Sequence, residues 1–132
     1  MTPEQLAAGG SEDGHQAALF CWIQQNKNDP RLPGIDRMFA IPNGGLRNKA
    51  TAGKLRAEGV RAGVADVFVP IPSGGYHGLF LEMKFGRNKL TELQKEFQNY
   101  ATQQGYCCKV AYSAEEAIEI IDYYLGSEAH DD

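Results

Sequence analysis

The sequence has no long apolar run and few cysteines. No stretch approaches the roughly 20 consecutive apolar residues that a membrane-spanning helix needs, and residues 1–5 do not open a secretory signal, which begins with a basic segment and continues with an apolar one. The cysteines, Cys21, Cys107 and Cys108, are three in number and two of them are adjacent. They match neither a disulfide framework nor a zinc site. We therefore expect a cytoplasmic protein without structural disulfides.

The 132 residues, 42% of them hydrophobic, are enough for one domain with its own core. We expect a single domain over 1–132, with flexible tails at 1–10 and 126–132. Helical and strand patterns follow one another in the order α-β-α-β-β-α-β-α, which predicts an α/β fold with a mixed sheet flanked by helices. The helices are expected at 11–26, 49–58, 91–104 and 113–125, and the strands at 38–41, 66–72, 76–84 and 106–112.

The segment 66–84 reads as a β-hairpin, because two apolar runs flank a turn of Ser73, Gly74 and Gly75. With the turn centred on Gly74, paired residue numbers sum to 148, so Asp66 lies opposite Glu82. Side chains opposite one another on one face have Cβ atoms roughly 5 Å apart, and Lys84 shares the face of Glu82. Two carboxylates this close repel one another unless a cation lies between them. The pattern suits an oxygen-ligated Mg²⁺ or Mn²⁺ ion beside a lysine.

A purely structural interpretation of the same residues also exists. Asp at the start of a strand is commonly a turn residue, and Glu and Lys two apart on a strand commonly form a solvated face. The strand around Glu82, however, is apolar on both faces, which predicts an interior strand. Charges on an interior strand break its own pattern, and such breaks are typical of functional sites.

Two more polar residues have two interpretations each. Glu12 either complements the dipole of the helix that begins near Ser11, or extends its buried stripe and reaches the hairpin. Gln94 closes a Thr91-Glu92-Leu93-Gln94 capping box. It also lies in the first turn of its helix, near the loop that leaves Lys84. In both cases the pattern leaves the choice open.

Basic residues gather in one part of a chain whose net charge is −4. Only Glu58 opposes them, and a sharp Pro42-Asn43-Gly44-Gly45 turn precedes them, where phosphate can approach backbone N–H groups. A local basic patch can hold a phosphate backbone, and it can equally be the solvated face of a helix. The basic residues are Arg47, Lys49, Lys54, Arg56 and Arg61.

Asp66 followed by Glu82-Met83-Lys84 after a hairpin resembles the signature of the PD-(D/E)XK nuclease superfamily. Neighbouring residues resemble a narrower family, the VRR-NUC (virus-type replication-repair nuclease) domain, over 12–125. One departure is Ala65, where the superfamily has Pro. The segments that carry the resemblance are Glu12 with Gln16, then 41–45, 59–63, Asp66, 78–84 and Gln94.

The resemblance implies a restriction-endonuclease-like core and a metal-dependent DNA endonuclease. Such an enzyme would hydrolyse phosphodiesters at branched, flapped or junction DNA in replication, repair or recombination. Small members of the family are bacterial or from phages, which places the protein in a bacterial or phage-infected cell, and they are expected to form homodimers. The alternative is a non-catalytic nucleic-acid-binding module with the same fold. A sequence-specific restriction enzyme is disfavoured, because 132 residues leave little room for a target-recognition domain.

The resemblance also implies a role for individual residues of the sequence. Asp66, Glu82 and the Met83 backbone carbonyl would hold Mg²⁺ or Mn²⁺, and Lys84 would be the catalytic lysine. Glu12 would be a further acidic contributor and Gln94 a supporting residue. The DNA contacts would come from the polar and basic residues Asn43, Arg47, Lys49, Lys54, Arg56 and Arg61.

Four tyrosines on late elements bear on the expected homodimer. Tyrosine is enriched in interface cores, and it fills monomer cores equally well. The residues are Tyr100, Tyr112, Tyr123 and Tyr124.

Overall fold

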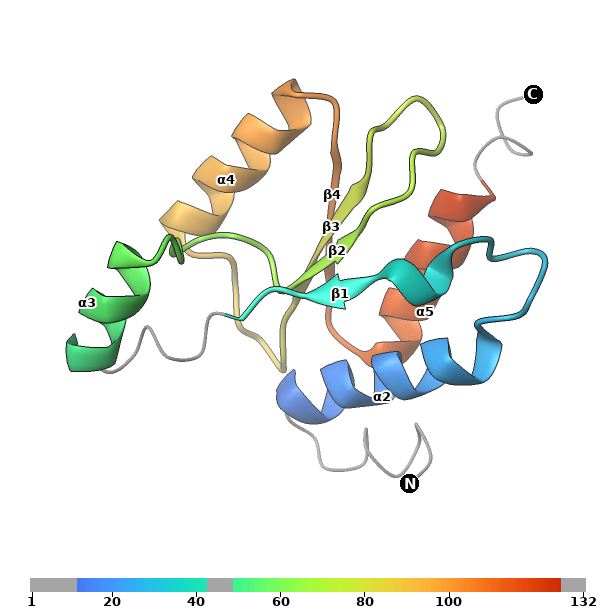
Figure 1. The fold of residues 1–132 in the computed structure, drawn as a ribbon, viewed down its shortest axis with the longest axis horizontal. Helices are drawn as coiled ribbons and strands as arrows, with labels where there is room; N and C mark the ends of the chain where they lie inside the picture. Colours follow the sequence, from blue (N-terminus) through green and yellow to red (C-terminus); the bar gives the residue numbers. More distant parts are fainter. Residues whose placement is uncertain (1–11, 43–48, 127–132) are drawn as a thin grey trace.

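The computed structural model describes residues 12–42 and 49–126, with side chains from 14 to 42 and from 51 to 126. The predicted element order is confirmed, with one added 3₁₀ turn (Figure 1). The elements are α2 (Glu12–Asn26), η1 (Ile35–Arg37), β1 (Phe39–Ala40), α3 (Lys49–Ala57), β2 (Val67–Val69), β3 (Leu79–Met83), α4 (Glu92–Gln103), β4 (Cys107–Ala111) and α5 (Ala114–Leu125). Of the expected tails at 1–10 and 126–132, only Gly126 is described, where it caps the end of α5, and the rest lie outside the described residues.

The four strands form one mixed sheet in the order β1-β2-β3-β4. β1 and β2 are antiparallel, as are β2 and β3, whereas β3 and β4 run parallel. β3 is thus an interior strand paired on both sides, as its apolar pattern predicted. The α/β class with a mixed, helix-flanked sheet is confirmed.

The register of the hairpin is the predicted one, but its turn is not centred on Gly74. Ser73 and Tyr76 exchange two backbone hydrogen bonds, of 3.1 and 2.9 Å, around a two-residue turn. Gly74 and Gly75 both have positive φ there, 57° and 86°, which glycine adopts without strain. One extra residue between β2 and Ser73 offsets the displaced turn. In the strands the paired numbers still sum to 148, in Val67–Leu81, Phe68–Phe80 and Val69–Leu79.

The sheet has helices on both faces (Figure 1). Side chains alternate along β3, so Leu79, Leu81 and Met83 point together to one face, where they are buried in the main core with α2 and α5. Phe80 and Glu82 point to the other face, which α4 covers. The Phe80 ring lies 5.0 Å from the ring of Phe97 on α4. The large apolar core and the charged residues of β3 therefore occupy opposite faces.

Tyr124 joins α5 to the hairpin. Its hydroxyl donates to the Ile71 carbonyl at 2.6 Å, and the Ser73 hydroxyl donates to the Tyr124 carbonyl at 2.6 Å. Tyr124 is only 4% exposed, and burial raises its pKa to about 12. Of the four late tyrosines, Tyr124 therefore belongs to the monomer core. The exposed ones are Tyr100, Tyr112 and Tyr123.

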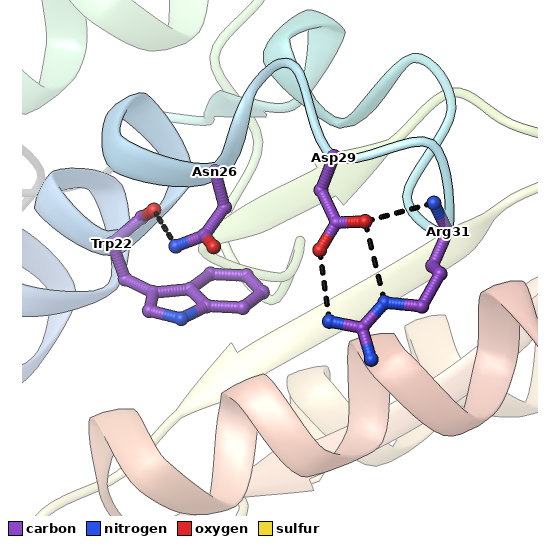
Figure 2. Close-up of polar contacts among 4 residues, drawn as sticks. All are labelled: Trp22, Asn26, Asp29 and Arg31. Atoms are coloured by element: carbon purple, nitrogen blue, oxygen red, sulfur yellow. Dashed lines mark hydrogen bonds and ion pairs between the residues drawn. The ribbon is translucent and has the colours of Figure 1, made fainter.

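The segment from α2 to β1 is held by local polar contacts (Figure 2). Asn26 donates its side-chain N–H to the Trp22 carbonyl at 2.8 Å, at the end of α2. Asp29 then accepts from the backbone N–H of Arg31 at 2.9 Å and pairs with its guanidinium at 3.0 Å. These hydrogen bonds lower the pKa of Asp29. They close the turn that leads the chain back to the sheet.

β1 is shorter than the strand expected over 38–41. It pairs with β2 at two residues only, and the next bond comes from the Ile41 N–H to the Asp66 carbonyl at 2.7 Å. Pro42 follows and has no N–H to donate, which ends the ladder there. The preceding turn, η1, was not predicted. In the described parts of the chain, no helix combines the length and the apolar character needed to cross a bilayer.

Candidate active site

Glu82 and Lys84 are buried charged side chains, 4% and 8% exposed. Glutamate and lysine are seldom buried to this extent unless each is paired or hydrogen-bonded. Lys84 continues the ladder one residue past β3, because its N–H donates to the Ala111 carbonyl at 2.8 Å. The alternation of side chains then places Lys84 on the same face as Glu82. Their burial on an interior strand does not fit the solvated-face interpretation.

Asp66 lies directly before β2, opposite Glu82 in the continued register. Its backbone carbonyl accepts from Ile41, and its Oδ2 accepts from the Met83 N–H at 2.8 Å. The carboxylate thus crosses the gap between β2 and β3. It is fixed to Met83, the residue that lies between Glu82 and Lys84.

Gln94 serves both purposes that its sequence position allowed. Its side-chain Oε1 accepts from the backbone N–H of Thr91 at 2.8 Å. Its backbone N–H donates to Thr91 Oγ1 at 3.2 Å, and the two bonds complete the capping box of α4. Its Nε2 also donates to Glu82 Oε1 at 3.0 Å. The first turn of α4 is therefore joined directly to the buried carboxylate.

The start of α2 lies beside the end of β3. The His15 ring is 6.0 Å from the ring of Phe85, the residue after Lys84. Its Nδ1 accepts from the Ala114 N–H at 3.4 Å. Glu12 begins this helix, but its side chain lies outside the described part of the chain. The predicted contribution of Glu12 remains a prediction.

The donor set at Asp66 and Glu82 consists of oxygen atoms. An extended residue directs its N–H and C=O to the same side of the strand, so the Met83 carbonyl faces the side on which Asp66 accepts the Met83 N–H. Two carboxylates and a carbonyl suit Mg²⁺ or Mn²⁺, which keep several water ligands, and do not suit Zn²⁺. No cluster of three His, Cys, Asp or Glu side chains that could hold a metal occurs within the described residues. The residues present fit a magnesium-type ion with two protein carboxylates.

The expected DNA-binding residues are only partly described. Asn43 and Arg47 lie outside the described residues, and the side chain of Lys49, the first residue of α3, is also not described. The remaining three, Lys54, Arg56 and Arg61, are exposed. Arg61 donates to the carbonyls of Arg56 at 2.9 Å and Val60 at 3.4 Å, so part of its guanidinium closes the end of α3.

The segment after α3 passes close to α4. Gly63 has φ 90°, and a Cβ there would lie 2.6 Å from the Leu93 carbonyl oxygen. Only glycine allows this approach, since any side chain would meet backbone atoms and a strained conformation. The contact holds the segment that follows α3 against the first turn of α4, which contains Gln94. Figure 1 shows α3 beyond that end of α4.

The backbone partners of the site were not predicted. Ile41 and Ala111 hold Asp66 and Lys84 through main-chain groups, and these contacts depend on strand order rather than on side-chain type. His15 was also missed, because only the packing of α2 beside β3 brings it near the site. No residue pattern in the sequence could have indicated these three contacts.

Comparison with known proteins identifies the family. Neither a family model nor a curated protein matches the chain. A solved structure described as a VRR_NUC domain protein is similar, with 32% sequence identity and a TM-score of 0.72. The similarity covers 87% of this chain and 88% of that one. With this identity over most of both chains, and with the nuclease-type α/β fold in common, the chain belongs to the VRR-NUC domain family.

Proposed function

We propose that the protein is a Mg²⁺- or Mn²⁺-dependent endonuclease that hydrolyses DNA phosphodiesters at branched, flapped or junction structures in replication, repair or recombination. The observation that carries this proposal is the buried pair Glu82 and Lys84 on an interior strand, with Asp66 fixed to the intervening Met83. A domain retained only for binding needs no buried, oriented carboxylate beside a buried ammonium.

Each residue has a role in this proposal. Asp66, Glu82 and the Met83 carbonyl would hold the metal ion, with Glu12 as a further acidic contributor. When bound, the ion supplies charge stabilisation at the phosphate and lowers the pKa of a coordinated water. Lys84 orients the attacking water or neutralises the charge that develops on the phosphate. Gln94 holds Glu82 Oε1 in place.

One exposed ring supports the preference for branched DNA. Phe39 is 49% exposed on the edge strand β1, and its ring lies 5.8 Å from that of Phe68 on β2. Phe68 is two residues from Asp66, so Phe39, Phe68 and Asp66 share one face of the sheet. Unpaired bases stack on aromatic side chains. A flap or junction would offer such bases beside the carboxylates.

The proposal is tested by incubating the purified protein with a panel of labelled flap, fork, four-way junction, single-stranded and linear duplex DNAs. We expect cleavage of branched substrates that requires Mg²⁺ or Mn²⁺ and stops with a chelator. Binding of the same DNAs without cleavage under any of these conditions would instead establish the non-catalytic binding module. Equal cleavage of linear and branched DNA would remove the structure preference and leave the nuclease.

Reversing the charge of Lys54 and Arg56 to glutamate is expected to weaken DNA binding similarly for all sequences. Both side chains are exposed on the basic helix α3. The slope of log K against log[salt] is negative, and each lost phosphate contact reduces its magnitude by about 0.9, so two should reduce it by about 2. The slope is measured by fluorescence anisotropy between low and moderate salt.

The matched control for this pair reverses two other exposed lysines, Lys27 and Lys109, which lie away from α3. This control changes the net charge by the same amount, so it measures how far the overall charge of the protein alone alters DNA binding. An effect of Lys54 and Arg56 on some sequences only, or the same change in the control, would contradict contact with the DNA backbone at α3.

We also propose that the protein acts as a homodimer, because cleavage on both sides of a junction needs two sites and each chain has one. Tyr100, Tyr112 and Tyr123 are large, exposed and available for such contacts. Light scattering at micromolar concentration should report about twice the 14.5 kDa chain mass. A monomer mass both with and without DNA would refute this.

A further inference from the structure

The Gln94 side chain is held at both ends. Its Oε1 accepts from the Thr91 N–H, and its Nε2 donates to Glu82 Oε1. An N–H group can only donate and an ionised carboxylate can only accept. Rotating the amide by half a turn would place oxygen against oxygen at Glu82 and N–H against N–H at Thr91. Thr91 therefore determines which end of Gln94 faces the carboxylate.

Thr91 controls the position of Gln94 by two separate groups. Its backbone N–H holds the amide oxygen, and its hydroxyl accepts from the Gln94 N–H at 3.2 Å, which fixes where α4 begins. The extended conformation of Thr91, with φ −74° and ψ 167°, is the one an N-cap requires. Without the hydroxyl, the backbone N–H of Gln94 loses its bond to Thr91, and the first turn of α4, which places Gln94 beside β3, is less firmly held.

Glu82 needs such support from outside its own strand. Three side-chain torsions separate its carboxylate from the rigid backbone of β3. Glu82 is buried, with Asp66 opposite it in the continued register and Lys84 two residues along, so the Asp66 carboxylate repels its charge and the Lys84 ammonium attracts it. The bond from Gln94 fixes Oε1 relative to the sheet. In sites of this kind, partners that orient a ligating side chain commonly contribute 10- to 100-fold to activity or affinity.

We propose that Thr91 is a positioning residue, which acts through the Gln94 amide to orient the Glu82 carboxylate. This inference rests on the proposed nuclease function for its effect on rate, and on the contacts alone for its effect on Gln94. Thr91 acts through two hydrogen bonds with Gln94, one donated by its backbone N–H and one accepted by its hydroxyl. Its side chain is exposed, so changes there leave the core intact.

The first test measures single-turnover cleavage of a branched DNA with Mg²⁺. We expect Thr91→Ala to lower the rate about tenfold, and Thr91→Ser, which keeps the hydroxyl, to restore it. In a Gln94→Ala background, Thr91→Ala should lower the rate by less than about twofold further, because two residues that act as one unit are not additive. A Thr91→Ala enzyme at the wild-type rate, or one with the full tenfold loss in both backgrounds, would overturn the proposal.

Loss of a helix cap also lowers stability, and Ser113→Ala controls for this. Ser113 caps α5 in the same way, accepting from the Glu116 N–H at 3.1 Å, and it belongs to a different helix from Gln94. Both alanine variants should melt a few degrees lower than the wild type, as expected for one lost cap. Only Thr91→Ala should lower the cleavage rate about tenfold. An equal loss of rate in Ser113→Ala would assign the effect to stability and overturn the proposal.

A second readout does not depend on cleavage. In the metal-free protein, NMR should show the side-chain amide protons of Gln94 exchanging more slowly with solvent than those of the exposed Gln103. Thr91→Ala should remove this difference and Thr91→Ser should keep it. If this holds while the wild type cleaves nothing, the positioning contact stands and the nuclease proposal fails. If Thr91→Ala leaves the exchange unchanged, the positioning proposal fails, whatever the enzyme cleaves.

Discussion

Replacing Asp66 by asparagine or Glu82 by glutamine is expected to abolish metal-dependent cleavage, with a loss of roughly 10³ or more. Both amides keep the size of the carboxylate and an oxygen that can accept the existing bonds from Met83 and Gln94. They remove the negative charge that a hard divalent cation needs. Single-turnover rates on the best substrate of the panel measure the loss.

The fold of these two variants should be intact, because neither change alters a contact of the main core on the opposite face of the sheet. Thermal melting followed by circular dichroism checks this. Asp122→Asn removes an exposed carboxylate from α5 and serves as the control, with an unchanged rate. Cleavage at the wild-type rate by either site variant would end the assignment of Asp66 and Glu82.

Lys84→Met should lower the cleavage rate by roughly 10² to 10³, the usual cost of losing one group that stabilises charge in the transition state. Methionine keeps an unbranched side chain in the buried position, 8% exposed, and removes only the ammonium and part of the stem. DNA affinity, measured by anisotropy in Ca²⁺, should remain within about twofold of the wild type, because the proposed role lies in the transition state.

The control for Lys84 is Lys95→Met on α4. Lys95 is exposed and paired with Glu92 at 3.3 Å, an arrangement that contributes little in water. Its loss should change neither rate nor affinity. The opposite result for Lys84, weaker binding with an unchanged rate at saturating DNA, would make it a phosphate clamp.

The elements with strong local signals were predictable from the sequence. Thr91 and Ser113 mark helix starts by their hydroxyls, and Gly105 marks the end of α4 by a positive φ of 94°. The predicted register of the hairpin holds only because one extra residue between β2 and Ser73 offsets the misplaced turn. The turn was misplaced, since adjacent glycines allow either centre.

The parts that depend on distant contacts were not predictable. The parallel pairing of β3 with β4 brings Ala111 beside Lys84, and no local pattern specifies that neighbour. Gln94 could be recognised as a cap from its spacing. Its second bond, to Glu82, arises only because α4 packs on that face. The catalytic, metal-binding and DNA-binding roles of all the candidate site residues remain predictions, and for Glu12, Asn43 and Arg47 the side-chain positions also lie outside the described residues.

The Gly74–Gly75 turn has a consequence for the order of folding. β2 and β3 are joined by this short connection, whereas β1 pairs with β2, and β3 with β4, across long intervening segments. Contacts that close short loops form fastest, because they cost the least chain entropy. We expect the hairpin to nucleate first, so Asp66 and Glu82 meet before the helices dock. Gln94 then arrives with α4 and fixes a carboxylate pair that is already assembled.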